Sequence, residues 1–186
     1  MSSQRSTNPD APDSVGMSWE LAAESITVRI RWFGLLVGYV LVNFVGSRPA
    51  EKTAVLNAIL TLGAVYAVID ALWSYRSKVF LSRMPIVISV LEAIFIGLLC
   101  YFDSGINSPF RFYYFLSLLV CAIRHSPRLT YTTLALHGLS FSALATSHWD
   151  STQDAAPAWS LTVIVMAWVT WAGTALAALL KRAGQR

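Results

Sequence analysis

Charged side chains are scarce in this sequence of 186 residues. Asp, Glu, Lys and Arg make up 13% of the chain, whereas hydrophobic residues make up 55%. A water-soluble domain of this length needs a much larger polar share to cover its surface. The charges also gather in short runs between long apolar stretches, which is typical of a membrane protein. The net charge of +4 then fits cationic membrane loops, and no nucleic-acid partner is expected.

Motifs for catalysis and metal binding are lacking as well. The sequence contains no Walker loop, His-Glu-x-x-His motif, Gly-rich nucleotide fingerprint or nucleophile–base pattern. We therefore expect no catalytic residue and no enzyme activity. Cys121 and His125 have the i, i+4 spacing that can hold copper or zinc, but two ligands are too few to define a metal site.

The two cysteines, Cys100 and Cys121, are not expected to pair. The span order given below places them near opposite faces of the bilayer, roughly 25–30 Å apart. A disulfide needs Cα atoms within about 7 Å of each other. The cysteines therefore do not indicate a redox compartment.

The sequence does have apolar segments that approach the length of about 20 residues needed to cross a bilayer as a helix. There are six, and the fourth is the shortest: residues 26–45, 54–73, 85–102, 109–123, 129–147 and 159–180. The predicted fold is an all-α membrane protein, a bundle of six transmembrane helices formed by residues 17–180. Residues 1–16 are polar and broken by proline, so they are predicted to be a disordered cytoplasmic tail. Residues 181–186 form a short cytoplasmic end.

Lys and Arg residues near the segment ends predict the orientation. One side of the predicted bundle collects ten of them and the other side three. The ten are Arg29, Arg31, Arg76, Lys78, Arg83, Arg124, Arg128, Lys181, Arg182 and Arg186, and the three are Arg48, Lys52 and Arg111. The side richer in cations normally faces the cytoplasm. We therefore predict a multi-pass protein of the inner membrane with both termini cytoplasmic.

Polar residues inside the apolar segments are functional candidates, because charge is costly at that depth. Glu92 and His137 lie at similar predicted depths on the third and fifth segments, where they could share one proton. Alternatively, Glu92 is a neutral acid hydrogen-bonded to a neighbouring helix. Asn43 and Asn57 are candidates for a hydrogen bond between helices. Asp70 is expected at the cytoplasmic interface.

The loop at residues 101–111 combines turn-forming residues with apolar ones. Ser104, Gly105, Asn107 and Pro109 predict a tight turn, and Phe110 begins an aromatic stretch. Such a loop would lie in the membrane interface and could bind a lipophilic ligand, with these five residues as its contacts. The alternative is a compact connector, which the physical chemistry alone favours.

Three features of the sequence resemble a known family. Arg31-Trp32 begins the first span, Glu92 lies in the third span twelve residues before Ser104-Gly105, and Ser104 to Phe110 follows the pattern Gly-Gly-x-x-Asn-Pro-Phe. Ser104 replaces the first Gly of that pattern, and Ser108 replaces its Asn. Over residues 25–180 the chain resembles the membrane-embedded N-terminal sensor region of bacterial six-transmembrane sensor histidine kinases, nearest the redox-responsive RegB type.

The resemblance implies a non-catalytic signal-input module of a two-component system. It also implies a quinone as the lipophilic ligand, no other cofactor, and a homodimer formed through the signalling output. A full-length parent would be a histidine kinase, whose phosphoacceptor and ATP-binding domains have no counterpart in this sequence. The alternative is a stand-alone accessory or quinone-contacting subunit of a larger membrane complex. A transporter is least favoured, because paired broken helices are lacking.

Overall fold

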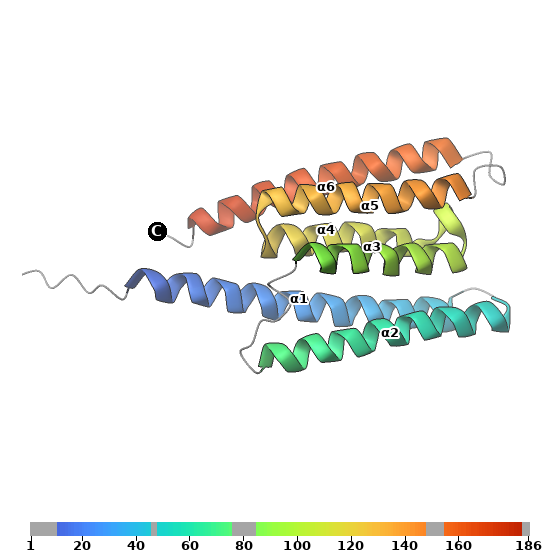
Figure 1. The fold of residues 1–186 in the computed structure, drawn as a ribbon, viewed down its shortest axis with the longest axis horizontal. Coiled ribbons are helices and arrows are strands. Elements are labelled where there is room, and N and C mark those ends of the chain that lie inside the picture. Colours follow the sequence, from blue (N-terminus) through green and yellow to red (C-terminus); the bar gives the residue numbers. More distant parts are fainter. Residues whose placement is uncertain (1–10, 46–47, 76–84, 148–154, 184–186) are drawn as a thin grey trace, which may run out of the picture.

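The computed structural model describes residues 11–45, 48–75, 85–147 and 155–183 (Figure 1). The described residues form α-helices joined by turns and contain no strand, which confirms the all-α prediction. The helices are α1 (Ala11–Phe44), α2 (Ala50–Tyr75), α3 (Pro85–Phe102), α4 (Phe112–Arg124), α5 (Pro127–Ser147) and α6 (Ala155–Ala183). Two 3₁₀ turns, η2 (Gly105–Asn107) and η3 (Pro109–Arg111), connect α3 to α4.

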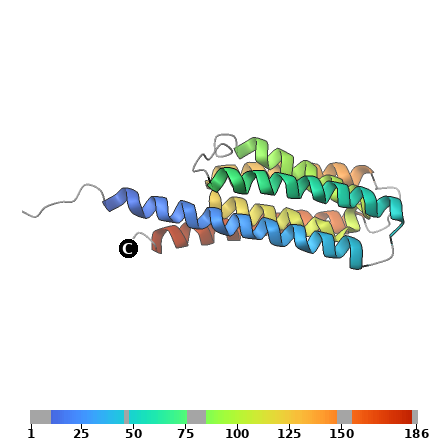
Figure 2. The same cartoon turned by 90° about the horizontal axis from the view of Figure 1, so that it is seen from below.

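The helices run up and down in alternation and form two groups. Helices α1 and α2 make an antiparallel hairpin, and α3 to α6 make a four-helix group beside it (Figures 1 and 2). The hairpin joins the group through α1 against α4 and α2 against α3. The beginning of α1 and the end of α6 lie at the same end of the molecule (Figure 1). This arrangement leaves a long seam between the hairpin and the four-helix group.

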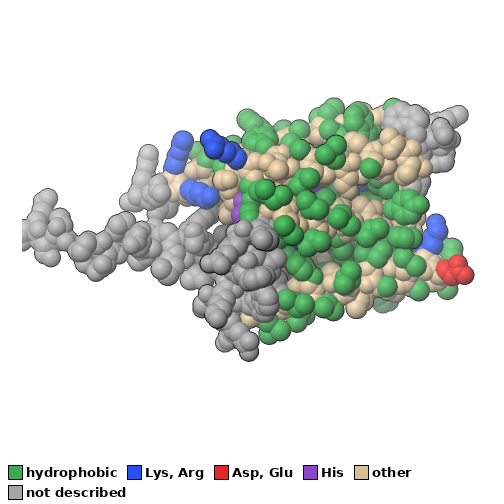
Figure 3. All heavy atoms as spheres, in the orientation of Figure 1, with side chains coloured by type: hydrophobic (Ala, Val, Ile, Leu, Met, Phe, Trp, Pro, Cys, Tyr) green, Lys and Arg blue, Asp and Glu red, His purple; other side chains and the backbone are tan. Residues whose placement is uncertain are grey.

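The outer surface of the bundle is apolar, which is the reverse of a soluble protein. Phe33, Leu62, Leu139 and Trp168 are each more than 60% exposed. Figure 3 shows hydrophobic side chains along the length of the bundle, with Lys and Arg at its ends. An exposed apolar area this large needs an apolar solvent. Together with the span lengths described next, it identifies a membrane protein.

Four helices among the described residues are long and apolar enough to cross a bilayer. Their spanning parts are Ile26–Phe44, Ala50–Ile69, Pro85–Phe102 and Ala155–Ala183. These correspond to the first, second, third and sixth predicted segments. Helix α5 has the expected length but carries many Ser and Thr residues. Helix α4 has 13 residues and therefore rises only about 20 Å, less than the thickness of the hydrocarbon core.

The ends of α2 and α6 differ from the predicted segments by up to four residues, and two other differences have a larger consequence for the loop and the N-terminus. The fourth helix was expected to begin at Pro109, but Pro109 opens η3 and α4 begins at Phe112. Here the Ser108 hydroxyl accepts a hydrogen bond from the amide of Phe110, which holds the chain in a tighter turn before the α-helix begins. The other difference is at the N-terminus, where α1 begins at Ala11, inside the segment predicted as a disordered tail. Residues 1–10 of that segment lie outside the described residues.

Candidate functional site

A charge pair joins the hairpin to the four-helix group within the apolar spans. The Arg31 guanidinium on α1 donates a hydrogen bond of 2.8 Å to Oε1 of Glu92 on α3. Ser117 Oγ on α4 donates a hydrogen bond of 2.6 Å to the second carboxylate oxygen, Oε2. The Arg31 and Glu92 side chains are 16% and 24% exposed. Three helices therefore meet at one carboxylate, at a depth where a lone charge would be costly.

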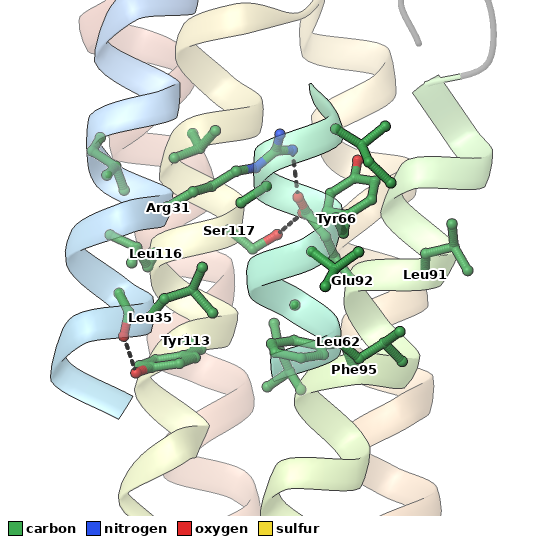
Figure 4. A pocket seen from close by; sticks show the side chains of 18 residues that line it. Arg31, Leu35, Leu62, Tyr66, Leu91, Glu92, Phe95, Tyr113, Leu116 and Ser117 are labelled. Carbon is green, nitrogen blue, oxygen red and sulfur yellow. Dashed lines mark hydrogen bonds and ion pairs between the residues drawn. The ribbon is translucent and has the colours of Figure 1, made fainter. Parts of the chain in front are cut away.

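A cavity of about 410 Å³ lies beside this charge pair, in the seam between the hairpin and helices α3 and α4. Its walls are mainly apolar side chains of these four helices, and Arg31, Glu92 and Ser117 provide much of its polar lining. The Arg31 guanidinium lies over the ring of Tyr66 on α2, 5.5 Å from the ring centroid. Figure 4 shows Arg31 and Ser117 both directed at Glu92, with Leu62, Leu91 and Phe95 around the space below.

A second contact across the seam joins α4 to α1 at two other residues that line the cavity. The Tyr113 hydroxyl on α4 donates a hydrogen bond to the carbonyl of Gly34 on α1 (Figure 4). On the α2 side, Gly63 lies so close to Phe95 that a Cβ atom there would come within 2.7 Å of the ring. Small residues let helices approach closely inside membranes. The absence of a side chain at Gly63 therefore allows Phe95 to form one wall of the cavity.

The predicted partner of Glu92, His137, has different contacts. His137 is fully buried, and its Nδ1 lies 2.8 Å from the carbonyl oxygen of Thr133. Its ring also makes an edge contact with Tyr114, with 5.2 Å between the ring centroids. Among the described side chains, no hydrogen bond joins Glu92 to His137, and Nε2 of His137 has no partner. Glu92 and His137 both face the interior of the bundle, but the partner of Glu92 is Arg31 and not the predicted His137.

The five predicted ligand contacts in the loop between α3 and α4 are used mainly for packing and turn formation. Phe110 is fully buried in the core, where its ring contacts Tyr113 with 5.6 Å between centroids. Gly105 is buried and has a φ angle of 63°, which a glycine adopts without strain. Ser104 and Asn107 are exposed, and Pro109 is partly buried. The expectation that Phe110 is a ligand contact is therefore wrong, because the core already covers its ring.

An ion pair at this end holds the loop to the hairpin. The Arg48 Nε lies 2.7 Å from Oδ1 of Asp103, and these side chains are 17% and 5% exposed. Asp103 Oδ2 also accepts hydrogen bonds from the hydroxyls of Ser104, at 3.0 Å, and Ser108, at 2.8 Å. The Arg48 guanidinium donates as well to the carbonyls of Leu41 and Val45 at the end of α1. This geometry favours the compact connector, the second of the two interpretations of the loop.

Other polar predictions have mixed outcomes. Asn43 and Asn57 exchange two side-chain hydrogen bonds of 3.0 Å, which confirms the predicted contact between helices. Cys100 and Cys121 are free, as expected, and the structure buries both of them. Within the described ranges, no group of three or more His, Cys, Asp or Glu residues could hold a metal ion. The side chain of Asp70 lies outside the part that the structure describes.

Sequence reasoning missed Arg31 as the partner of Glu92, although one signal was present. Arg31 lies five residues from the cationic end of the first predicted span. Glu92 lies seven residues from the cationic end of the third predicted span. At 1.5 Å per residue, these depths differ by about 3 Å. A comparison of the predicted depths of all charged residues, and not only those of Glu92 and His137, would have suggested that Arg31 pairs with Glu92.

Comparisons with protein-family models, with curated proteins and with solved structures find no match to this chain.

Proposed function

We propose that this chain is the signal-input module of a membrane sensor, placed in the inner membrane with six spans and both termini cytoplasmic. In this proposal the module performs no catalysis. It converts a stimulus in the membrane into a small movement of its helices and passes this movement through the end of α6 to a cytoplasmic output. The resemblance to RegB-type sensor regions suggests that this output is a histidine kinase.

The observation that carries this proposal is the contact between Arg31 and Glu92. These residues are two of the three points of resemblance to the sensor family, and they are 61 positions apart in the sequence. Residues so far apart have no local reason to lie 2.8 Å from each other. Their contact supports the view that the resemblance reflects one shared feature, an ion pair between the first and third helices.

The arrangement of the ion pairs is also suited to signalling. Arg31–Glu92 fastens the hairpin at one place along the seam, and Arg48–Asp103 fastens it at the loop end. Between these two places the seam holds the cavity beside Glu92. A stimulus that weakens one of these two ion pairs would let the hairpin shift against the four-helix group as a rigid body. Helix α6 packs on α4 and α5, so such a shift would be transmitted to its cationic end.

The test is a chimera in which residue 186 of the whole chain is joined to the dimerisation and ATP-binding domains of a RegB-type kinase. Autophosphorylation is measured in inside-out membrane vesicles. We expect Arg31→Ala to change the phosphorylation level several-fold, because it leaves Glu92 without its cationic partner. Leu139→Ala, at an exposed position of α5, is the matched control and should leave the level unchanged. If Arg31→Ala and the control give the same phosphorylation, the proposal fails.

Reporter fusions test the proposed orientation separately. Alkaline phosphatase, which is active only in the periplasm, is fused after Gly16 and after Arg186 in two different proteins. We expect both fusions to be inactive, because ten cations flank the spans on the side of the termini. Activity of either fusion would refute the six-span topology. Stable copurification of the chain with a respiratory complex, together with an unresponsive chimera, would favour the accessory-subunit alternative.

A further inference from the structure

The cavity in the seam has its mouth on the lipid side of the molecule. Three residues that line it, Leu62 and Val65 on α2 and Leu91 on α3, are also exposed on the outer surface, by 68%, 51% and 50%. Both helices are among those able to span a bilayer. The space therefore opens between α2 and α3 toward lipid, and a molecule dissolved in the bilayer can enter without crossing water.

The Glu92 carboxylate supplies hydrogen-bond acceptor sites in the polar part of the cavity. A carboxylate has about four acceptor sites, and the hydrogen bonds from Arg31 and Ser117 use two of those on Glu92. The hydroxyl hydrogens of Ser117 and Tyr113 are already donated, to Glu92 and to the Gly34 carbonyl, so their oxygens can only accept. A ligand that brings a hydrogen-bond donor can therefore use the acceptor sites that remain on Glu92.

Charge narrows the class of ligand further. Arg31 and Glu92 neutralise each other, so the site as a whole has no net charge to attract an ion. A charged ligand would be attracted by one member of the pair and repelled by the other, so little net attraction would offset the cost of removing it from water. A hydroxyl group donates a hydrogen bond and brings no charge. The remaining walls are apolar and suit a hydrocarbon chain.

We propose that this cavity binds a neutral lipid-phase alcohol, with its hydroxyl group donating to Glu92 and its apolar chain lying between α2 and α3. The volume of about 410 Å³ is within the range of sites for small organic ligands. Such a ligand would add a hydrogen bond at the carboxylate that joins α1, α3 and α4, and would separate the walls of the seam. The inference deepens the proposed function and rests on it, since it names the ligand of the input module.

The experiment uses the whole chain in phosphatidylcholine nanodiscs and a 1-dodecanol probe that carries a photoreactive diazirine in its chain. After irradiation, the labelled peptides are identified by mass spectrometry. We expect the label on α2 and α3 near Leu62 and Leu91. Unlabelled 1-dodecanol should compete with the probe about tenfold better than dodecane, dodecanoic acid or dodecylamine, a ratio that corresponds to about 1.4 kcal/mol.

Two variants fill the cavity from different walls, and a third serves as their control. A Cβ at Gly34 meets only Leu116, at 3.5 Å, so Gly34→Leu extends into the space, and Leu116→Trp fills it from α4. Each should weaken labelling about tenfold, the effect of excluding about two methylene groups from an apolar site. At Gly138 on α5, a Cβ would meet no atom within 4 Å, so Gly138→Leu adds the same side chain away from the cavity and should label like wild type.

Circular dichroism and gel filtration establish that each variant is folded before it is labelled. The inference is overturned if both folded filling variants label like wild type, or if the label lies on helices that do not line the cavity. It is also overturned if dodecane competes as well as 1-dodecanol, because the hydroxyl group then has no role. A chimera that responds to Arg31→Ala while 1-dodecanol fails to bind would refute the ligand site and leave the signalling proposal standing.

Discussion

The Asp103 carboxylate is expected to be one of the most important polar groups for the stability of this protein. It is 5% exposed and accepts three side-chain hydrogen bonds, from Arg48 at 2.7 Å, Ser108 at 2.8 Å and Ser104 at 3.0 Å. Asp103→Ala removes all three and leaves the Arg48 cation without its counter-charge at the end of the hairpin. Removing one partner of a buried ion pair costs about 3–5 kcal/mol.

The lower end of that range applies here, for two structural reasons. Arg48 is 17% exposed, and its hydrogen bonds to the carbonyls of Leu41 and Val45 do not depend on Asp103. We therefore expect Asp103→Ala to lower the free energy of unfolding by about 3 kcal/mol. Asp103→Asn keeps an acceptor for the two serine hydroxyls but loses the charge, so a cost of about 1–2 kcal/mol is expected.

The assay is unfolding by sodium dodecyl sulfate in dodecyl maltoside micelles, followed by tryptophan fluorescence. Asn107→Ala is the matched control in the same loop, because Asn107 is exposed and its side chain makes no hydrogen bond within the described residues; its effect should stay within about 0.5 kcal/mol. A double-mutant cycle of Arg48→Ala and Asp103→Ala should give a coupling of at least about 1.5 kcal/mol. Equal costs for Asp103→Ala and Asn107→Ala, or strictly additive single effects, would refute this reasoning.

Three further predictions follow from the packing and from one histidine. Phe110→Ala should cost about 3–5 kcal/mol of unfolding free energy in the same assay, with or without quinone, because Phe110 is fully buried, whereas Phe112→Ala at a 56% exposed position should cost little. Gly97→Ala should lower the thermal midpoint, since its Cβ would come within 2.9 Å of a serine oxygen on α5, while Gly138→Ala should leave it unchanged or raise it. Burial lowers the pKa of His125, in the turn after α4, from 6.5 to about 4. As the pH falls, this imidazole therefore takes up a proton in the unfolded chain at a higher pH than in the folded protein, which favours unfolding. Stability should therefore be complete above pH 6.5 and fall toward pH 4, and the loss measured by thermal unfolding should be smaller in His125→Gln; an equal loss in both proteins would contradict this assignment.

The apolar sequence pattern determined the helices, because each must satisfy its own backbone hydrogen bonds wherever lipid replaces water. For that reason the third predicted segment, residues 85–102, coincides with α3, and the asparagine pair could be predicted from depth alone. The start of the fourth helix could not be predicted this way. It depends on the hydroxyl of Ser108, which accepts from an amide two residues ahead and holds the chain in a 3₁₀ turn that no hydrophobicity pattern records.

Tertiary structure decided the candidate site. The sequence showed that Glu92 needs a partner, because a lone charge is costly at that depth, but periodicity along one helix does not say which neighbour it faces. Helix α1 packs beside α4, and this placement brings Arg31 rather than His137 to the carboxylate. Likewise, the loop residues showed turn chemistry, but only the packing of Phe110 into the core distinguished a connector from a binding surface. The cavity itself depends on how the hairpin lies against the four-helix group, which is a relation between distant segments that a single sequence does not specify.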